Sequence, residues 1–409
     1  MPERLNSADA ALRARAAKVI PGGMWGHLNA ANLPEGYPQF FARARGCRLW
    51  DVDGNEVVDF MCSWGPIVLG HHHPAVEEAV RAQALQGATM NGPGAVLVEL
   101  AEQMTAMLPA ADWCLFEKNG TDATTACVTI ARAGTGRRKV LLARGSYHGA
   151  APWCSPSLVG VTAEDRAHII HYDYGDLDSV RAALAEAGDD CAAVLASAFR
   201  HDMAKALELP TRDYAQGLRA LCDAAGAALI LDDVRAGFRL HLGGSWEAYG
   251  VRPDFSAWSK AIANGYALSA VTGAERWREA AARVFTTGSF WAEATSMAAS
   301  LATLRELQRV DGPAVMAAMG ERLRAGFSAL AAQYGVGVTH SGPPQMPLML
   351  FDGDADFSKG NAFCSAALRA GAYFHPKHNM FLSTAHGPAD IDRGLEAAEA
   401  GFRAVSRMR

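Results

Sequence analysis

The sequence predicts an α/β protein with a mostly parallel central sheet and helices on both of its faces. The first observation behind this prediction is the alternation of apolar, strand-like runs with helical runs from about residue 113 to about residue 231. The second is size, because 409 residues, 50% of them hydrophobic, can build a sizeable core and two domains. The third is that both chain ends break this alternation, so a smaller α+β domain is expected to form from them.

The elements before residue 113 begin with a helix that ends near residue 17, followed by a turn at Pro21-Gly22-Gly23. Residues 47–60 read as a hairpin, because two alternating runs meet at Asp53-Gly54, a favoured turn pair. A helix over 75–86 and a turn over 91–94 precede another helix. We therefore assign 1–70 to the smaller domain.

The middle of the chain supplies the parallel sheet. Strands are expected over 113–117, 139–143, 192–197 and 227–231, with helices over 121–133 and 213–226. Ligands of such sheets bind beyond the carboxyl ends of the strands, and Asp232 lies at one of these ends. After residue 295 the chain becomes helical again, with a strand-like run over 346–352 and a last helix from about residue 389. The predicted large domain is 71–295, and 296–409 belongs to the small one.

Bulk properties exclude several classes of protein. A net charge of -5 makes no electrostatic case for binding nucleic acid or an anionic membrane. The eight cysteines are scattered without a C-x-x-C pair, which is typical of reduced core residues in a cytoplasmic protein. The N-terminus has no apolar signal core, and no run approaches the roughly 18 apolar residues of a membrane helix. The three histidines at 71–73 point in different directions and lack a carboxylate or cysteine set, so no metal site is expected.

Two features could hold a phosphate and a flat ring. KNGTDAT (118–124) lies between a strand and a helix, where backbone amides and the Thr121 hydroxyl can cradle a phosphate; it is equally an ordinary helix cap. YHG (147–149) follows the strand over 139–143, and an aromatic there can stack on a ring, although a core or rim tyrosine gives the same pattern. Neither feature is decisive alone.

Two charged residues complete the set. Asp232 can keep a pyridine nitrogen protonated, since opposite charges favour the charged forms, although a helix cap or surface turn would also use it. Lys260 is a lone cation in a small-residue, apolar stretch, where burial lowers a lysine pKa and suits a Schiff-base amine; a lysine reaching to solvent is the alternative. Phosphate cradle, aromatic, carboxylate and lysine, in this order, are the parts that hold pyridoxal phosphate.

At this point the chain resembles class III aminotransferases of pyridoxal-phosphate fold type I, in particular the glutamate-1-semialdehyde 2,1-aminomutase-like branch. The likeness runs from IPGG (20–23) to STAHGPADID (383–392). Its other motifs are SWGPIVLGHHHP (63–74), ARAGTGRRKV (131–140), SYHG (146–149), LDDVRAGFR (231–239) and SKAIANGY (259–266).

The resemblance implies roles for single residues. Lys260 would form the internal aldimine and move the proton, and Asp232 would pair with the pyridine nitrogen. The other residues implied to bind the cofactor are Asn119, Gly120, Thr121, Tyr147, His148, Val234 and, from the neighbouring subunit, Ser289. Because the family is dimeric with shared sites, a homodimer is expected.

Departures from the family pattern concern the substrate. MWGHLN (24–29) replaces the aminomutase segment, and Ser197-Ala198 replaces a Glu-Pro pair. Arg235 could bind the cofactor's phenolic oxygen or a substrate carboxylate, or it could pair with Asp233. The residues expected to contact substrate are Trp25, His27, Trp64 and Arg235, although a tryptophan in the core is the alternative for Trp25 and Trp64.

The function expected from this resemblance is amino-group transfer from an amine or amino acid donor to a keto acid or aldehyde acceptor. An intramolecular aminomutase or an amino-acid epimerase would use the same cofactor, and a non-catalytic protein could keep the fold. Because a non-catalytic protein needs neither Lys260 nor Asp232, the presence of both argues against that third possibility.

Overall fold

The structure is a computed structural model that describes residues 6–408. The chain forms two compact units, which are described separately. One consists of Met1–His73, Met203–Ala206 and Ala314–Arg409, and the other of Pro74–Asp202 and Leu207–Pro313. The domain boundaries expected from the sequence, after residues 70 and 295, stay predictions.

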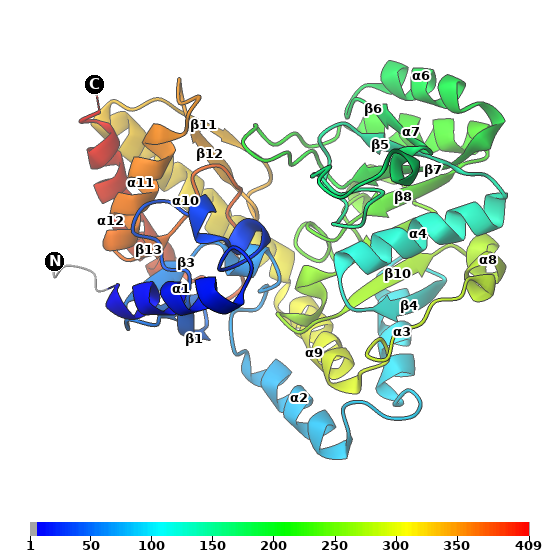
Figure 1. Cartoon of the computed structure of the whole chain (residues 1–409), viewed down its shortest axis with the longest axis horizontal. Helices are drawn as coiled ribbons and strands as arrows, with labels where there is room; N and C mark the ends of the chain where they lie inside the picture. The colour runs from blue at the N-terminus through cyan, green and yellow to red at the C-terminus, as the bar shows by residue number, and fades with distance from the viewer. Residues whose placement is uncertain (1–5, 409) are drawn as a thin grey trace. The chain divides into compact units, whose positions relative to one another are not determined.

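The unit made of Pro74–Asp202 and Leu207–Pro313 contains a seven-stranded sheet in the order β4-β10-β9-β8-β7-β5-β6 (Figure 1). All its pairings are parallel except those of β10, which runs antiparallel to both β4 and β9. The strands are β4 (Trp113–Glu117), β5 (Lys139–Ala143), β6 (Ile169–Tyr172), β7 (Cys191–Ser197), β8 (Ala228–Asp232), β9 (Phe255–Trp258) and β10 (Ser269–Gly273). The predicted α/β fold with a mostly parallel sheet is therefore confirmed, although β6, β9 and β10 were not predicted.

Helices cover both faces of this sheet. The helices α6 (Leu177–Ala187) and α7 (Arg212–Ala225) pack with the sheet in one hydrophobic cluster, and α4 (Gly120–Thr135) and α8 (Arg278–Arg283) pack in another. The remaining helices of this unit are α2 (Pro74–Gln86), α3 (Val96–Met107), α5 (Ala163–Arg166) and α9 (Ala294–Val310). Because the strands are buried on both faces, they read as continuous apolar runs without alternation.

The other unit is built around a four-stranded sheet in the order β1-β2-β3-β13. The predicted hairpin is confirmed, because its two strands pair antiparallel around Gly54, which has φ +85°. Residues from the two chain ends meet here, since the last strand of the sheet pairs parallel with the third. The elements are α1 (Ser7–Val19), β1 (Phe41–Arg45), β2 (Arg48–Asp51), β3 (Glu56–Asp59), α10 (Gly312–Tyr334), β11 (Val338–Ser341), β12 (Leu348–Phe351), α11 (Ser358–Arg369), β13 (Ala372–Tyr373) and α12 (Pro388–Val405).

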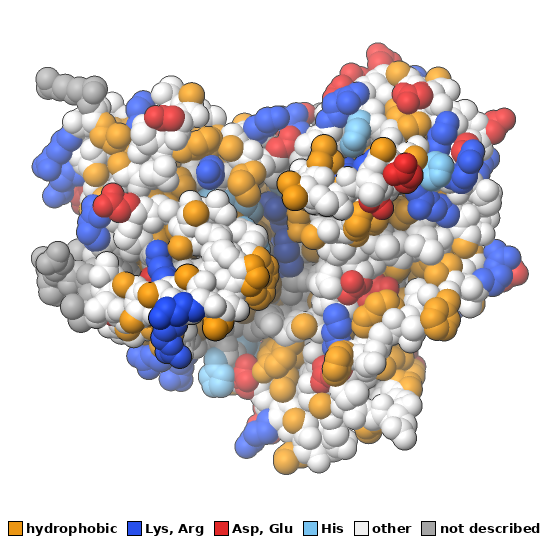
Figure 2. Space-filling model, in the orientation of Figure 1, with side chains coloured by type: hydrophobic (Ala, Val, Ile, Leu, Met, Phe, Trp, Pro, Cys, Tyr) orange, Lys and Arg blue, Asp and Glu red, His pale blue; other side chains and the backbone are white. Residues whose placement is uncertain are grey.

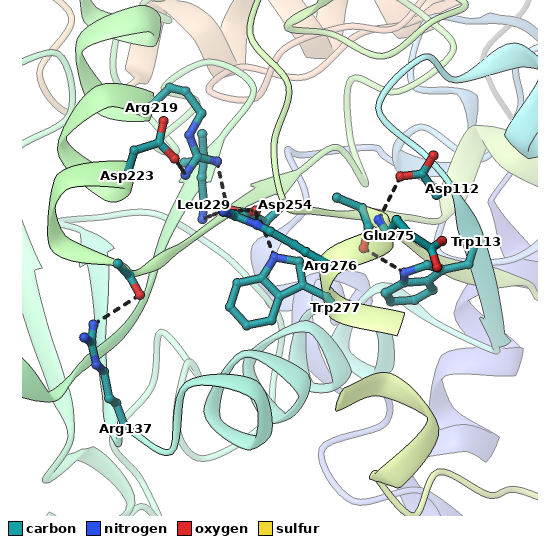
Figure 3. Close-up of polar contacts among 12 residues, drawn as sticks. Asp112, Trp113, Arg137, Arg219, Asp223, Leu229, Asp254, Glu275, Arg276 and Trp277 are labelled. Atoms are coloured by element: carbon teal, nitrogen blue, oxygen red, sulfur yellow. Dashed lines mark hydrogen bonds and ion pairs between the residues drawn. The ribbon is translucent and has the colours of Figure 1, made fainter. Parts of the chain in front are cut away.

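A buried carboxylate organises the amino ends of β8 and β9. Asp254, 3% exposed, accepts hydrogen bonds from the Leu229 amide at 2.9 Å, the Trp277 indole at 2.9 Å and Arg219 at 2.8 Å, and it also pairs with Arg276 (Figure 3). Burial alone would raise the pKa of Asp254, but these donors outweigh it and lower the pKa below its ordinary value. The network therefore stabilises the edge of the sheet opposite to Asp232.

The surface in Figure 2 carries Lys and Arg side chains interspersed with Asp and Glu. Among residues 6–408, no helix has the length and apolar character needed to cross a membrane.

Candidate active site

A cavity of about 250 Å³ lies beyond the carboxyl ends of the parallel strands, where open α/β sheets bind ligands. The loops that follow β4, β5, β7, β8 and β9 all contribute to it. The lining residues are Asn119, Gly120, Thr121, Tyr147, His148, Gly149, His201, Asp232, Val234, Arg235, Ser259 and Lys260. The structure thus brings together four segments that the sequence analysis singled out, and it does so within one of the two units.

Asp232 is the last residue of β8, and its buried carboxylate is held on both oxygens. One oxygen lies 2.7 Å from Nδ1 of His148, and the other accepts the Val234 amide at 3.1 Å. His148 is itself buried, and its Nε2 has no hydrogen-bond partner in the part of the chain that the structure describes. The imidazole therefore orients Asp232 toward the cavity.

Lys260 follows β9 and opens a short 3-10 turn, Lys260–Ala263. Its backbone has φ +49° and that of Asn264 has φ +45°, a strained conformation for residues with a side chain. Burial and, to a smaller extent, the positive charge of Arg235 lower the pKa of Lys260 to about 7, although the negative charge of Asp232 opposes this shift. Near neutral pH a large share of this amine is unprotonated, so it can act as a nucleophile or a base.

At the start of α4, the side chain of Asn119 caps the helix, and the backbone amide of Gly120 is left without a hydrogen bond among residues 6–408. The side chain of Asn119 accepts the amides of Thr121 and Asp122 at 3.0 and 3.3 Å in a capping box. Within residues 6–408, no hydrogen bond uses the Gly120 amide. The Thr121 hydroxyl accepts the Ala150 amide at 3.1 Å, which leaves its own proton to donate. An anion at this helix start would therefore meet one free amide and one hydroxyl donor.

Two glycines, Gly120 and Gly149, allow the backbone to pass close to other side chains of the cavity wall. A Cβ on Gly120 would lie 2.8 Å from a methyl carbon of Val234. A Cβ on Gly149, which has φ +132°, would lie 2.6 Å from the Thr121 hydroxyl. A side chain at either position would therefore displace Val234 or Thr121, so both positions require glycine. Tyr147 is 45% exposed and borders the same space.

The pairing of Arg235 with Asp233 that the sequence left open is wrong. Asp233 instead accepts hydrogen bonds from the backbone amide and the hydroxyl of Ser245. Burial raises the pKa of Asp233 to about 6 in spite of these donors. Arg235 lines the cavity, where Asp232 and Tyr147 are its electrostatic neighbours and burial lowers its pKa to about 10.

The other expected substrate residues lie in the unit that contains both chain ends. His27 and Trp64 line a cavity of about 600 Å³ within that unit, and their rings are 4.6 Å apart at 69°. Trp25 is 68% exposed. Ser289, expected to act from a neighbouring subunit, is exposed in the loop before α9. The substrate roles of Trp25, His27 and Trp64 and the cofactor role of Ser289 stay predictions.

His71, the first of the three consecutive histidines, has a partner within its own unit. His71 lies 2.9 Å from the buried carboxylate of Asp59. No group of three or more His, Cys, Asp or Glu side chains in residues 6–408 is arranged to hold a metal ion.

Sequence reasoning missed three lining residues, His201, Gly149 and Ser259. Gly149 belongs to the YHG segment and Ser259 precedes Lys260, so both were close to recognised motifs. His201 has no motif of its own, and the one signal near it was the departure at Ser197-Ala198.

Comparison with known proteins identifies the family. Residues 32–386 match the model of class III aminotransferases. The chain is 45% identical over 396 residues to an aminopentol aminotransferase of Sphingopyxis macrogoltabida, covering 97% of this chain and 94% of that protein. It is 31% identical over 415 residues to a 3-aminobutyryl-CoA aminotransferase of Cloacimonas acidaminovorans (strain Evry), covering 100% of both.

Solved structures agree with this family. The FumI protein of Sphingopyxis sp. MTA144, solved in its PLP internal aldimine form, superposes with a TM-score of 0.96 at 45% identity, covering 98% of this chain and 96% of that one. A glutamate-1-semialdehyde aminomutase of Pseudomonas aeruginosa PAO1 shares the fold, with a TM-score of 0.86, but only 22% identity over 97% of this chain and 94% of that one. The relatives that share more sequence are aminotransferases, so the expected placement in the aminomutase-like branch is not supported at that level. This chain belongs to the class III aminotransferase family.

Proposed function

We propose that the chain is a pyridoxal-phosphate-dependent aminotransferase whose catalytic amine is Lys260. The observation that carries the proposal is the juxtaposition, in one cavity, of a buried lysine with a lowered pKa and a buried carboxylate, Asp232. Pyridoxal phosphate, when bound, supplies an aldehyde that carries the amino group and a pyridine ring that withdraws electrons.

The cavity fits that cofactor. Asp232 supplies an anion for a ring nitrogen, and its hydrogen bond to His148 fixes the orientation of the carboxylate. The open Gly120 amide and the Thr121 hydroxyl are suited to a phosphate, while Asn119 fixes the helix start through its side chain. Val234 and Tyr147 are placed to flank the ring, and Lys260 is the amine that would hold the aldehyde carbon.

Lys260 also serves as the proton carrier in this proposal. An amine with a pKa of about 7 can accept a proton from the substrate carbon and return it, because neither protonation state is strongly favoured near neutral pH. Arg235 and the surrounding burial keep the pKa in that range, and Asp232 limits the decrease.

We further propose that the amino donor is an amine without a carboxylate on the amino carbon. An aminopentol and a 3-aminobutyryl thioester, the compounds named for the two relatives, both have this property. The acceptor is a keto acid or an aldehyde. Trp25, His27 and Trp64 remain proposed contacts for the rest of the donor, supported by the apolar character of the cavity that His27 and Trp64 line.

A homodimer with Ser289 reaching the partner's phosphate site is part of the same proposal. The loop around Ser289 presents Phe285 and Phe290, which are 89% and 65% exposed, and a second copy would cover them. Size-exclusion chromatography with light scattering measures the mass of the assembly. The affinity of Ser289→Ala for the cofactor, compared with that of wild type, tests the cofactor contact separately.

The decisive experiment follows the absorbance of the bound cofactor. A primary amine, a β-amino acid and an α-amino acid are added one at a time to the holoprotein, followed by pyruvate. We expect the amine to bleach the absorbance and pyruvate to restore it, in wild type and in Lys18→Ala on the exposed face of α1, but not in Lys260→Ala.

Other outcomes select other functions. An amine rearranged or inverted without an acceptor would establish the aminomutase or epimerase alternative, including the aminomutase-like branch. A protein that binds no pyridoxal phosphate would refute the proposal.

A further inference from the structure

His201 is a histidine in the cavity wall that has no role in the chemistry described so far. It lies in the loop between β7 and α7, beyond the carboxyl end of β7. Its ring borders the same cavity as Lys260 and Arg235. The ring also packs edge-on against Phe199, with centroids 5.3 Å apart at 77°, which holds it in place.

The imidazole of His201 has hydrogen-bonding capacity that this chain does not use. Apart from an interaction with its own backbone, it forms no hydrogen bond with any other residue in 6–408. His201 is partly buried and lines the cavity, so its ring nitrogens are accessible to a molecule bound there. A neutral imidazole offers one N–H donor and one nitrogen acceptor.

The surroundings of His201 are positively charged. Burial holds its pKa well below the ordinary value, and Arg235, Lys260 and His148 lower it further. Therefore His201 is neutral near neutral pH. The one carboxylate among the described lining residues is Asp232, which is already held by His148 and the Val234 amide. This side of the cavity thus favours a negative, oxygen-bearing group over a second cation.

We propose that His201 and Arg235 together bind the carboxylate of the keto-acid acceptor, with His201 as a specificity-determining residue. The inference rests on the proposed function, because it concerns the second substrate of that reaction. Arg235 supplies the charge and a planar set of donors that matches a carboxylate, and the His201 N–H adds one hydrogen bond. An amine donor without a carboxylate would not use these contacts, so the two substrates would be recognised differently.

The test compares pyruvate with its methyl ester, methyl pyruvate, which has no negative charge on the carboxyl group. The holoenzyme is first converted to its amino form with the amine donor, and the acceptor half-reaction is then followed by cofactor absorbance. The variants are His201→Phe, which keeps a ring but removes both nitrogens, and His201→Gln, which keeps a donor. His168→Phe is the matched control, because His168 lies at the amino end of β6, on the opposite edge of the sheet.

We expect His201→Phe to lower kcat/KM for pyruvate by about 10-fold, the size expected for one hydrogen bond to a charged group, and to change methyl pyruvate by less than about 3-fold. His201→Gln should stay within about 3-fold of wild type for both acceptors. The donor half-reaction, the cofactor affinity and the cofactor spectrum should be unchanged in the His201 and His168 variants.

A double-mutant cycle tests the shared carboxylate. The cycle uses the ratio of kcat/KM for pyruvate to kcat/KM for methyl pyruvate, because Arg235→Gln also raises the pKa of Lys260 and thereby affects both acceptors. Arg235→Gln should lower this ratio by about 100-fold, and the double variant should lose less than the product of the two effects, because both residues bind the same group. If His201→Phe does not fold, the smaller His201→Leu replaces it in the cycle.

Three outcomes would overturn the proposal. Equal losses for pyruvate and methyl pyruvate would make His201 a general structural residue. A fall in cofactor affinity with unchanged acceptor selectivity would assign it to the cofactor. Fully multiplicative effects would show that the two residues bind different groups. Failure of the wild-type enzyme to transfer an amino group at all would instead count against the proposed function, so the two failures are distinguishable.

Discussion

The amine of Lys260 should titrate near pH 7 in the cofactor-free protein. The difference between the ordinary lysine pKa of 10.5 and about 7 corresponds to ~5 kcal/mol at 1.36 kcal/mol per pH unit. Burial is the main cause and the charge of Arg235 the second. Arg235→Gln should therefore raise the pKa of Lys260 by about 1 unit, since it removes a like charge from a desolvated site.

Competitive labelling measures this titration directly. The cofactor-free protein is treated with trace acetic anhydride between pH 5 and pH 11, and the acetylation of each lysine is read by peptide mass spectrometry. Exposed Lys18 on α1 serves as the internal reference. Lys260 reactivity should reach its plateau by about pH 8 in wild type and by about pH 9 in Arg235→Gln. A Lys260 rate that still rises above pH 9 in wild type would refute the electrostatic reasoning.

Stability must follow the same titration. Between pH 7 and 10.5 the unfolded state binds a proton on Lys260 that the folded state does not. The free energy of unfolding of the cofactor-free protein should therefore rise by about 1.4 kcal/mol per pH unit in that window, and Lys260→Met should remove this rise. Urea unfolding of the two proteins at several pH values checks it, and identical pH dependence would contradict the assignment.

Three further changes have effects that the structure makes specific. Asp254→Ala should cost about 3–5 kcal/mol of unfolding free energy in urea, because it leaves buried donors unpaired, with no change in cofactor affinity. Because the pKa of Asp254 is lower in the folded than in the unfolded protein, part of the stability that Asp254 provides should also be lost as the pH falls below the ordinary value of 3.8. Gly149→Ala should weaken cofactor binding about 10- to 100-fold in equilibrium titrations, since its Cβ would displace the hydroxyl of Thr121, and unchanged affinity would count against that hydroxyl as a phosphate donor. His148→Ala should shift the cofactor spectrum and slow turnover about 10-fold by freeing one oxygen of Asp232, with unaltered kcat as the contrary result.

Much of the fold could be predicted because local chemistry and topology agree. The strands β4 and β5 match their predicted ranges, because a short apolar run bounded by turn residues is typical of a buried strand. Asp53-Gly54 predicted the hairpin because that pair suits a tight turn. In contrast, β10 was missed: it is a five-residue strand in a stretch noted for its lysine, and one of its two antiparallel neighbours, β4, lies about 150 residues earlier in the sequence.

The start of α4 shows where local reasoning becomes ambiguous. KNGTDAT was compatible with a phosphate cradle and with an ordinary cap, and the structure contains features of both. The Asn119 side chain forms the cap, and the Gly120 amide stays open beside it. Only the tertiary structure could show that the cap and an open amide occur together, because the sequence pattern of both is the same.

The sequence by itself determined the fold class, the family and the order of the residues that meet in the cavity. These follow from patterns within single segments and from motifs whose spacing is read along the chain. Tertiary structure decided which charges face one another: Asp233 contacts Ser245, whereas Arg235 and His201 line the cavity. The reason is physical, because burial and electrostatic neighbours depend on distances between loops that the sheet brings together, and those distances are not encoded in any one segment.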